Sequence, residues 1–207
     1  VPGSVYKDLL RNGFIKDPLM DQNSLECEWV ANRSWVYQTG FYVDPVYRGK
    51  NIFLHFKGID YRASFFLNGK QIGSHTGMFR PANLNITDLI SYEDKNIISV
   101  VLDKPPEEYG QIGFTSETRT QKSRFNYKWD FSTRLVNVGL YDEAYIACYG
   151  AARLTYAKIT PVLNENRWRV HLEFELERFQ ENFVMLEAVL YDGNRAVKIF
   201  KTEQIKS

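Results

Sequence analysis

The Asn68-Gly69 dipeptide, which stands between two β-prone runs, is the feature that most constrains the fold of this chain. Residues 63–67 precede it and residues 70–73 follow it. Asn and Gly both accept the positive φ that a type I′ turn requires at its two central positions, and the twist of that turn matches the twist of the flanking strands. The dipeptide therefore predicts a two-residue β-hairpin.

Alternation of apolar and polar residues with a period of two is the second strong pattern. Ile52, Leu54 and Phe56 would share one face of a strand, with His55 and Lys57 on the other, which predicts a half-buried strand. A helix is expected only over residues 4–10. The same pattern predicts further strands over residues 96–102, 145–149, 154–163, 167–177, 183–191 and 196–203.

A short Gly-Ala-Ala linker at residues 150–152 divides the chain into a domain at 1–149 and a second at 150–207. The second is too short for a complete immunoglobulin-like sandwich, which needs about 100 residues. Both termini are therefore expected to be cut, the first because it lacks Met and a signal pattern. Residues 168–176 would leave an apolar strand face uncovered, so a homodimer through the second domain is expected.

The charge balance argues against polyanionic partners. Lys and Arg total 26 and Asp and Glu total 25, for a formal net charge of +1. A nucleic-acid or anionic-membrane partner calls for a basic face, so neither is expected. His55, His75 and His171 are dispersed without metal-ligand spacing, and no phosphate loop or nucleophile motif occurs. We therefore expect no metal and no cofactor.

Several segments resemble a known family. Residues 66–81, followed by 85–89 and 96–100, are similar to the N-terminal sugar-binding domain of glycoside hydrolase family 2. The opening at residues 1–10, with 15–18, is similar to the start of the β-mannosidases within that family. The resemblance implies an all-β fold, with an antiparallel jelly-roll (galactose-binding-like) sandwich at 1–149 and the first part of an immunoglobulin-like sandwich at 150–207.

The resemblance also implies a function. Members are retaining exo-glycosidases whose two catalytic glutamates lie on a (β/α)8 barrel, so no catalytic residue is expected in this chain. The implied partners are a β-linked oligosaccharide or glycoside and the barrel of the same polypeptide. The implied location is periplasmic or secreted for a bacterial protein and lysosomal for an animal one. The alternatives are a free-standing carbohydrate-binding module and a family 2 glycosidase for another sugar, such as a β-galactoside or β-glucuronide.

The candidate site lies in residues 105–134, a long aperiodic stretch of the kind that is usually functional. Trp129 and Asp130 match the first two residues of the Trp-Asp-Trp-Gly loop of β-mannosidases, which holds the terminal mannose, while Phe131 replaces the second Trp. A carboxylate accepts hydrogen bonds from sugar hydroxyls, and an aromatic ring covers the C–H face of a pyranose. The alternative is that Trp129 packs in the core and Asp130 caps a turn.

Nearby charged residues have open interpretations. Arg80 follows a Gly-Met-Phe run shared with the family, and is either a buried ion-pair partner or a residue that lines the pocket with Phe131. The stretch also carries four cations, which we expect to form salt bridges within the loop or to pack against the barrel: Arg119, Lys122, Arg124 and Lys128.

Overall fold

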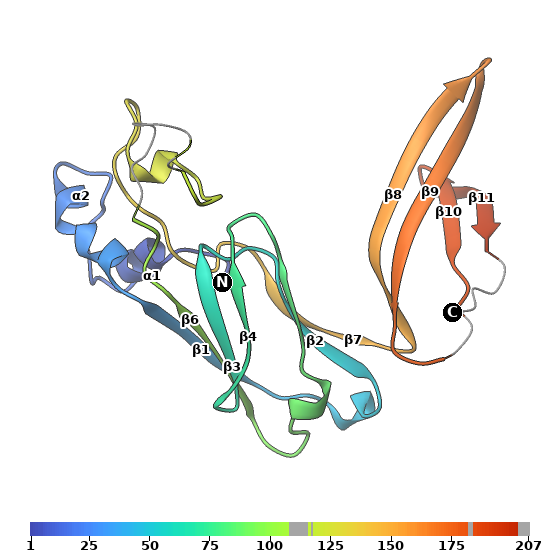
Figure 1. The fold of residues 1–207 in the computed structure, drawn as a ribbon, viewed down its shortest axis with the longest axis horizontal. Helices are drawn as coiled ribbons and strands as arrows, with labels where there is room; N and C mark the ends of the chain where they lie inside the picture. The colour runs from blue at the N-terminus through green and yellow to red at the C-terminus, as the bar shows by residue number, and fades with distance from the viewer. Residues whose placement is uncertain (108–115, 117, 182–183, 203–207) are drawn as a thin grey trace. The chain divides into compact units, whose positions relative to one another are not determined.

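The computed structural model describes residues 1–107, 116, 118–181 and 184–202 (Figure 1). The chain divides into two compact units. The first contains Val1–Arg48 and Ile52–Ala147, and the second contains Gly49–Asn51 and Cys148–Ser207. The division falls after residue 147, whereas the sequence places the domain boundary after residue 149. Residues 108–115 and 117 of the predicted loop lie outside the described residues, as do the ends of two predicted strands at 183 and 203.

Two sheets form the first unit. The four-stranded sheet has the order β1 (Trp35–Phe41), β6 (Asn96–Leu102), β3 (Arg62–Leu67) and β4 (Lys70–Thr76). The three-stranded sheet has the order β5 (Ala82–Asn85), β2 (Asn51–Phe56) and β7 (Ala144–Tyr149). The pairs β1–β6, β6–β3, β3–β4 and β2–β5 are all antiparallel. The predicted all-β antiparallel sandwich is confirmed.

The core of the first unit lies between these sheets. Residues of β6 alternate between buried and half-buried, so that Ile98, Val100 and Leu102 face inward. The ring of Phe56 on β2 lies 4.9 Å from the ring of Phe65 on β3, which is fully buried. Burial of such a side chain contributes about 1.5–3 kcal/mol, so these contacts are a main source of cohesion between the sheets.

Strand β2 differs from its prediction. It was expected to bury only one face, but Phe53 and His55 are as buried as Ile52, Leu54 and Phe56. One face packs on the other sheet through Phe56, and on the opposite face the His55 ring stacks with the Tyr145 ring of β7 at 4.8 Å. Because His55 is only 7% exposed, its polar ring needs a partner, which is the side-chain oxygen of Asn83 at 2.7 Å from Nδ1.

The hairpin predicted at Asn68-Gly69 is confirmed. Strands β3 and β4 are joined by these two residues, with φ of 51° at Asn68 and 82° at Gly69. Both values lie in the left-handed region that a type I′ turn uses. The side chain of Asn68 also accepts a hydrogen bond from the backbone N–H of Ile97 at 2.8 Å, which fastens the turn to the start of β6.

Helices are short. The predicted N-terminal helix is confirmed as α1 (Val5–Arg11), whose cap Ser4 accepts a hydrogen bond from the Lys7 N–H at 3.4 Å. A second helix, α2 (Asn23–Glu26), was not predicted. The described residues include the 3-10 turns η1 (Glu28–Asn32), η2 (Pro45–Tyr47), η3 (Thr87–Leu89) and η5 (Phe125–Tyr127). Among the described residues, no helix has the length and hydropathy needed to cross a bilayer.

The second unit consists of two antiparallel hairpins. One joins β8 (Ala152–Asn164) to β9 (Arg167–Arg178), and the other joins β10 (Glu187–Asp192) to β11 (Arg195–Lys201). The four strands agree with the four predicted ones. Large apolar side chains on these strands are exposed, with Trp168 68% and Ile159 70% accessible.

Candidate functional site

Trp129 and Asp130 lie in a tight turn. The backbones of Trp129 and Ser132 exchange two hydrogen bonds of 3.2 and 3.1 Å, which places Asp130 and Phe131 at the tip between them. Trp129 is half-buried and Asp130 is exposed. In the described part of the chain, nothing donates a hydrogen bond to the Asp130 carboxylate or pairs with it. The alternative of a core Trp beside a capping Asp is therefore wrong.

Three aromatic rings lie close together in this part of the chain. The ring of Phe131 lies 5.7 Å from that of Phe125 and 6.4 Å from that of Trp129, which it meets edge to face. Phe131 is 76% exposed and Phe125 is 48% exposed. We call residues 125–132, which carry these three rings and Asp130, the aromatic turn. The two most exposed of these rings, Phe125 and Phe131, thus lie together at the surface of the turn.

A buried tyrosine holds the base of the aromatic turn. Tyr127 is 5% exposed and packs with Ala31 and Val136 in a small apolar cluster. Its hydroxyl donates a hydrogen bond to the Pro106 carbonyl at 2.6 Å. Burial raises the pKa of Tyr127 to about 12, and the negative charge of Asp60 adds to this shift. Tyr127 thus anchors the turn. At the preceding residue, the Asn126 carbonyl accepts a hydrogen bond from the Leu135 N–H at 3.0 Å.

Lys128 redirects the chain into the aromatic turn. Its φ is 110°, in a region that favours glycine and that lysine rarely adopts. This conformation lies directly between the buried Tyr127 and the half-buried Trp129. Non-glycine residues in such regions carry a cost and cluster at functional sites.

Arg80 is not buried. It is exposed, and its guanidinium donates a hydrogen bond to the Thr76 carbonyl at 3.2 Å. Within the described ranges no carboxylate pairs with it, so the interpretation as a buried ion-pair partner is wrong. Its neighbour Met78 does contact the loop, because the Ser123 N–H approaches the Met78 sulfur at 3.4 Å. No described contact joins Arg80 to the aromatic turn.

Lys122 does not pair within the loop as expected. Lys122 is fully buried, and its Nζ lies 2.5 Å from each carboxylate oxygen of Asp60, far outside the loop. Arg124 donates to the Thr120 carbonyl. Sequence reasoning missed Asp60, because a partner 62 residues away leaves no local pattern. The only available signal was a lone acid in an otherwise apolar segment after β2.

Burial acts on both charges of this pair. It raises the pKa of the Asp60 carboxyl, with Lys122 opposing the shift. It lowers the pKa of the Lys122 ammonium, with Asp60 opposing the shift. Each group thus depends on the other to remain ionised.

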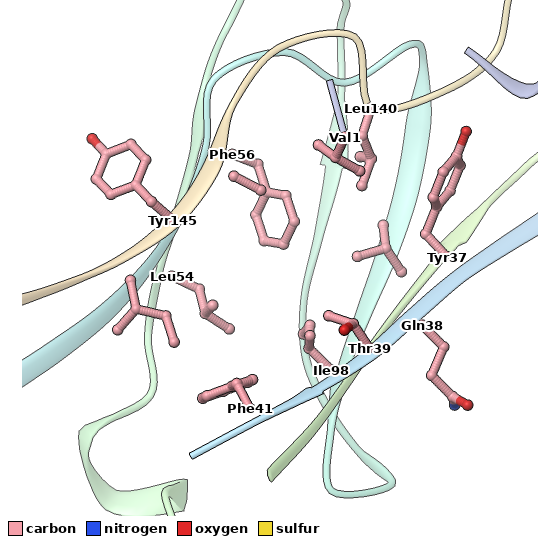
Figure 2. A pocket seen from close by; sticks show the side chains of 13 residues that line it. Val1, Tyr37, Gln38, Thr39, Phe41, Leu54, Phe56, Ile98, Leu140 and Tyr145 are labelled. Atoms are coloured by element: carbon pink, nitrogen blue, oxygen red, sulfur yellow. The ribbon is translucent and has the colours of Figure 1, made fainter. Parts of the chain in front are cut away.

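An apolar hollow of about 420 Å³ lies between the two sheets (Figure 2). Leu54, Phe56 and Ile98 contribute to its lining, and Tyr37 is one of its few polar members. The Tyr37 hydroxyl is already bonded to Asp8 at 2.9 Å. A sugar needs several converging hydrogen-bond partners, so this lining does not suit one. None of the predicted site residues lines it.

Metal ligation finds no support in the described residues, where no group of three or more His, Cys, Asp or Glu side chains is arranged to hold an ion. At the aromatic turn, the Asp130 carboxylate can accept hydrogen bonds and the aromatic rings can stack.

Comparison with known proteins identifies the family of the first unit. Residues 1–142 match the model of the family described as glycosyl hydrolase 2 galactose-binding domain-like, which is more than half of the chain. The chain belongs to this family. Beta-mannosidase B of Emericella nidulans is 29% identical over 164 residues, which cover 73% of this chain and 20% of that protein. The chain thus spans about a fifth of the length of the curated relatives that it matches.

Solved structures share the fold. The β-D-mannosidase from Dictyoglomus thermophilum superposes with a TM-score of 0.85 at 24% identity, over 100% of this chain and 26% of that one. The β-glucuronidase from Ruminococcus gnavus, solved with D-glucuronic acid, gives a TM-score of 0.63 at 20% identity, over 83% of this chain and 29% of that one. At these identities the likeness establishes the fold of the family 2 domain.

Proposed function

We propose that this chain is the non-catalytic N-terminal sugar-binding region of a retaining exo-glycosidase of the β-mannosidase type. In this proposal the aromatic turn reaches into the terminal-sugar pocket of a (β/α)8 barrel in the same polypeptide. The observation that carries it is the exposed, unpartnered Asp130 carboxylate at the tip of a turn flanked by aromatic rings. The similarity to β-mannosidases supports the choice of sugar.

The chemistry follows from the charges at the tip. The Asp130 carboxylate accepts hydrogen bonds from adjacent sugar hydroxyls, and charged acceptors make stronger hydrogen bonds than neutral ones. The half-buried Trp129 ring offers a face to the C–H groups of the sugar. Asp130 orients the sugar and takes no part in proton transfer. The barrel supplies one carboxyl that protonates the leaving oxygen and a second, about 5 Å away, that attacks the anomeric carbon.

Calorimetric titration of this chain with mannose and mannobiose tests the binding part of the proposal. Half a pocket should bind with a Kd in the millimolar range or weaker, so the binding free energy should be no stronger than about −4 kcal/mol. Saturable, tighter binding that Asp130→Ala abolishes would instead favour a free-standing carbohydrate-binding module.

The sugar is tested separately, with a panel of aryl β-glycosides and the complete polypeptide encoded by the gene. The proposal expects the mannoside to be hydrolysed fastest. A clear preference for the galactoside or glucuronide would reject the mannosidase type while keeping the glycosidase.

We further propose that two copies of the chain associate through the second unit. Support comes from the exposed Ile159 and Trp168 on a hairpin whose strands pair only with each other among the described residues. Light scattering should show a concentration-dependent dimer that Ile159→Lys disrupts. A monomer at every concentration would reject this association.

A further inference from the structure

The buried ion pair between Lys122 and Asp60 joins the loop to the sandwich. The side chains are 0% and 2% exposed, and the Lys122 ammonium also donates to the Asn137 carbonyl at 2.7 Å. All three partners of the ammonium are oxygens, so its donors are satisfied without water. An ion pair in this setting gains little or nothing in stability over apolar residues of similar volume. What it offers is a defined geometry that apolar packing does not impose.

Asp60 is itself fixed on the sandwich. Its N–H donates to the Gly139 carbonyl at 2.9 Å, and its carbonyl accepts from the Gly139 N–H at 3.0 Å. Gly139 has a φ of 155°, and a Cβ there would meet the Ser4 Cα at 2.8 Å, so this approach requires glycine. The carboxylate therefore projects from a backbone bridge that cannot shift easily.

Lys122 stands seven residues before Trp129 on the segment that carries the aromatic turn. Between them, Ser123 contacts Met78 and Tyr127 packs against Ala31. Together with the Tyr127 hydrogen bond to the Pro106 carbonyl, those contacts hold the base of the turn, and the ion pair adds a charged contact to them. The ion pair fixes which residue of the loop meets the sandwich. Of residues 122–129, Lys122 is the one that places its ammonium against Asp60.

We propose that Lys122 and Asp60 are positioning residues that hold the aromatic turn in place. Their consequence for sugar binding rests on the proposed function of Asp130, but their effect on the turn does not. Loss of the pair should leave the sandwich folded and release the turn.

Hydrogen exchange, measured on this chain without sugar, tests the proposal. The amides of Trp129, Ser132 and Leu135 report the turn, because each donates a backbone hydrogen bond there, and the amides of β3 and β6 report the sandwich. In the double variant Asp60→Asn with Lys122→Met, which removes both charges together, we expect at least tenfold faster exchange in the turn and unchanged exchange in the strands.

Two further variants keep the test decisive. Asp60→Asn alone leaves the buried Lys122 ammonium without its counter-charge, so it should show the same selective change at larger size. Lys57→Met removes the exposed ion pair with Glu143, whose side chains are 48% and 62% accessible, and should change neither set of amides. Uniformly faster exchange in strands and turn, or unchanged exchange in the turn, would overturn the proposal. Failure of the complete polypeptide to hydrolyse β-mannosides would overturn the proposed function and leave this result intact.

Discussion

The side-chain amide of Asn68 donates a hydrogen bond to the side-chain oxygen of Asn96 at 2.9 Å, linking the hairpin turn to a fully buried polar residue. Asn96 also accepts from the Ser91 N–H at 2.9 Å and donates to the Ser91 carbonyl at 2.7 Å. These three side-chain hydrogen bonds join Asn96 to the two loops beside β6. The pair therefore connects the strongest sequence signal of the chain to the interior of the sandwich.

Replacement of Asn96 should be costly. Asn96→Ala leaves the Ser91 N–H and the Asn68 amide without their acceptor, and we expect a loss of about 2–3 kcal/mol in the free energy of unfolding. Asn85→Ala is the matched control, because Asn85 is exposed and its partners can turn to water. Urea denaturation measures both. Equal, small losses would show that the buried network does not stabilise the sandwich.

Lys128→Gly should stabilise the chain. The φ of 110° at Lys128 suits glycine, so the substitution relieves a backbone cost of about 1–3 kcal/mol. The greater freedom of glycine in the unfolded state costs about 0.5–1 kcal/mol in return. The expected net gain is about 1 kcal/mol, measured by thermal and urea unfolding. Lys50→Gly, at an exposed residue without positive φ, should instead destabilise. A loss at both positions would argue against the described backbone at Lys128.

Substitutions of two neighbouring aromatic residues of the loop should change the free energy of unfolding by very different amounts. Phe131→Ser should change the free energy of unfolding by less than about 0.5 kcal/mol, because the side chain is 76% exposed. Tyr127→Ala should cost about 3–5 kcal/mol, because it empties a buried site and removes the hydrogen bond to Pro106. A large loss for Phe131→Ser would show that this ring is covered.

Alkaline pH should reveal the buried tyrosines. Burial raises the pKa of Tyr6 and of Tyr127 from 10 to about 12, and raises that of Tyr37 further with help from its bond to Asp8. A raised folded-state pKa contributes stability that is complete below pH 10 and is lost as the pH rises through 12. Absorbance of the tyrosinate ion should therefore show a late class of tyrosines, smaller by one in Tyr127→Phe. A single midpoint near 10 would contradict this.

Local signals predicted much of the first unit. The turn at Asn68-Gly69, the alternation in β6 and the capped helix after Ser4 are properties of short segments, and each is found where expected. The burial of both faces of β2 depends on its neighbours in the sheet, which no local period encodes. The same limit applies to α2, a four-residue helix without a side-chain cap.

The candidate site was only partly accessible to sequence reasoning. Trp129 and Asp130 were chosen through a resemblance, and their place in an exposed turn required the structure. The pairing of Lys122 with Asp60 is a long-range contact, so local charge counts suggested partners within the loop instead. Arg80 was ambiguous for the same reason, since exposure is decided by tertiary packing.

Hydrolysis of 4-nitrophenyl β-mannoside by the complete polypeptide encoded by the gene tests the central claim most directly. We predict that Asp130→Ala lowers kcat/KM at least about 100-fold, which corresponds to about 2.7 kcal/mol of lost transition-state binding. Asp88→Ala, at an exposed carboxylate of the same unit, should stay within about twofold of the unaltered enzyme. An unchanged kcat/KM in Asp130→Ala, or no hydrolysis of the mannoside at all, would contradict the account.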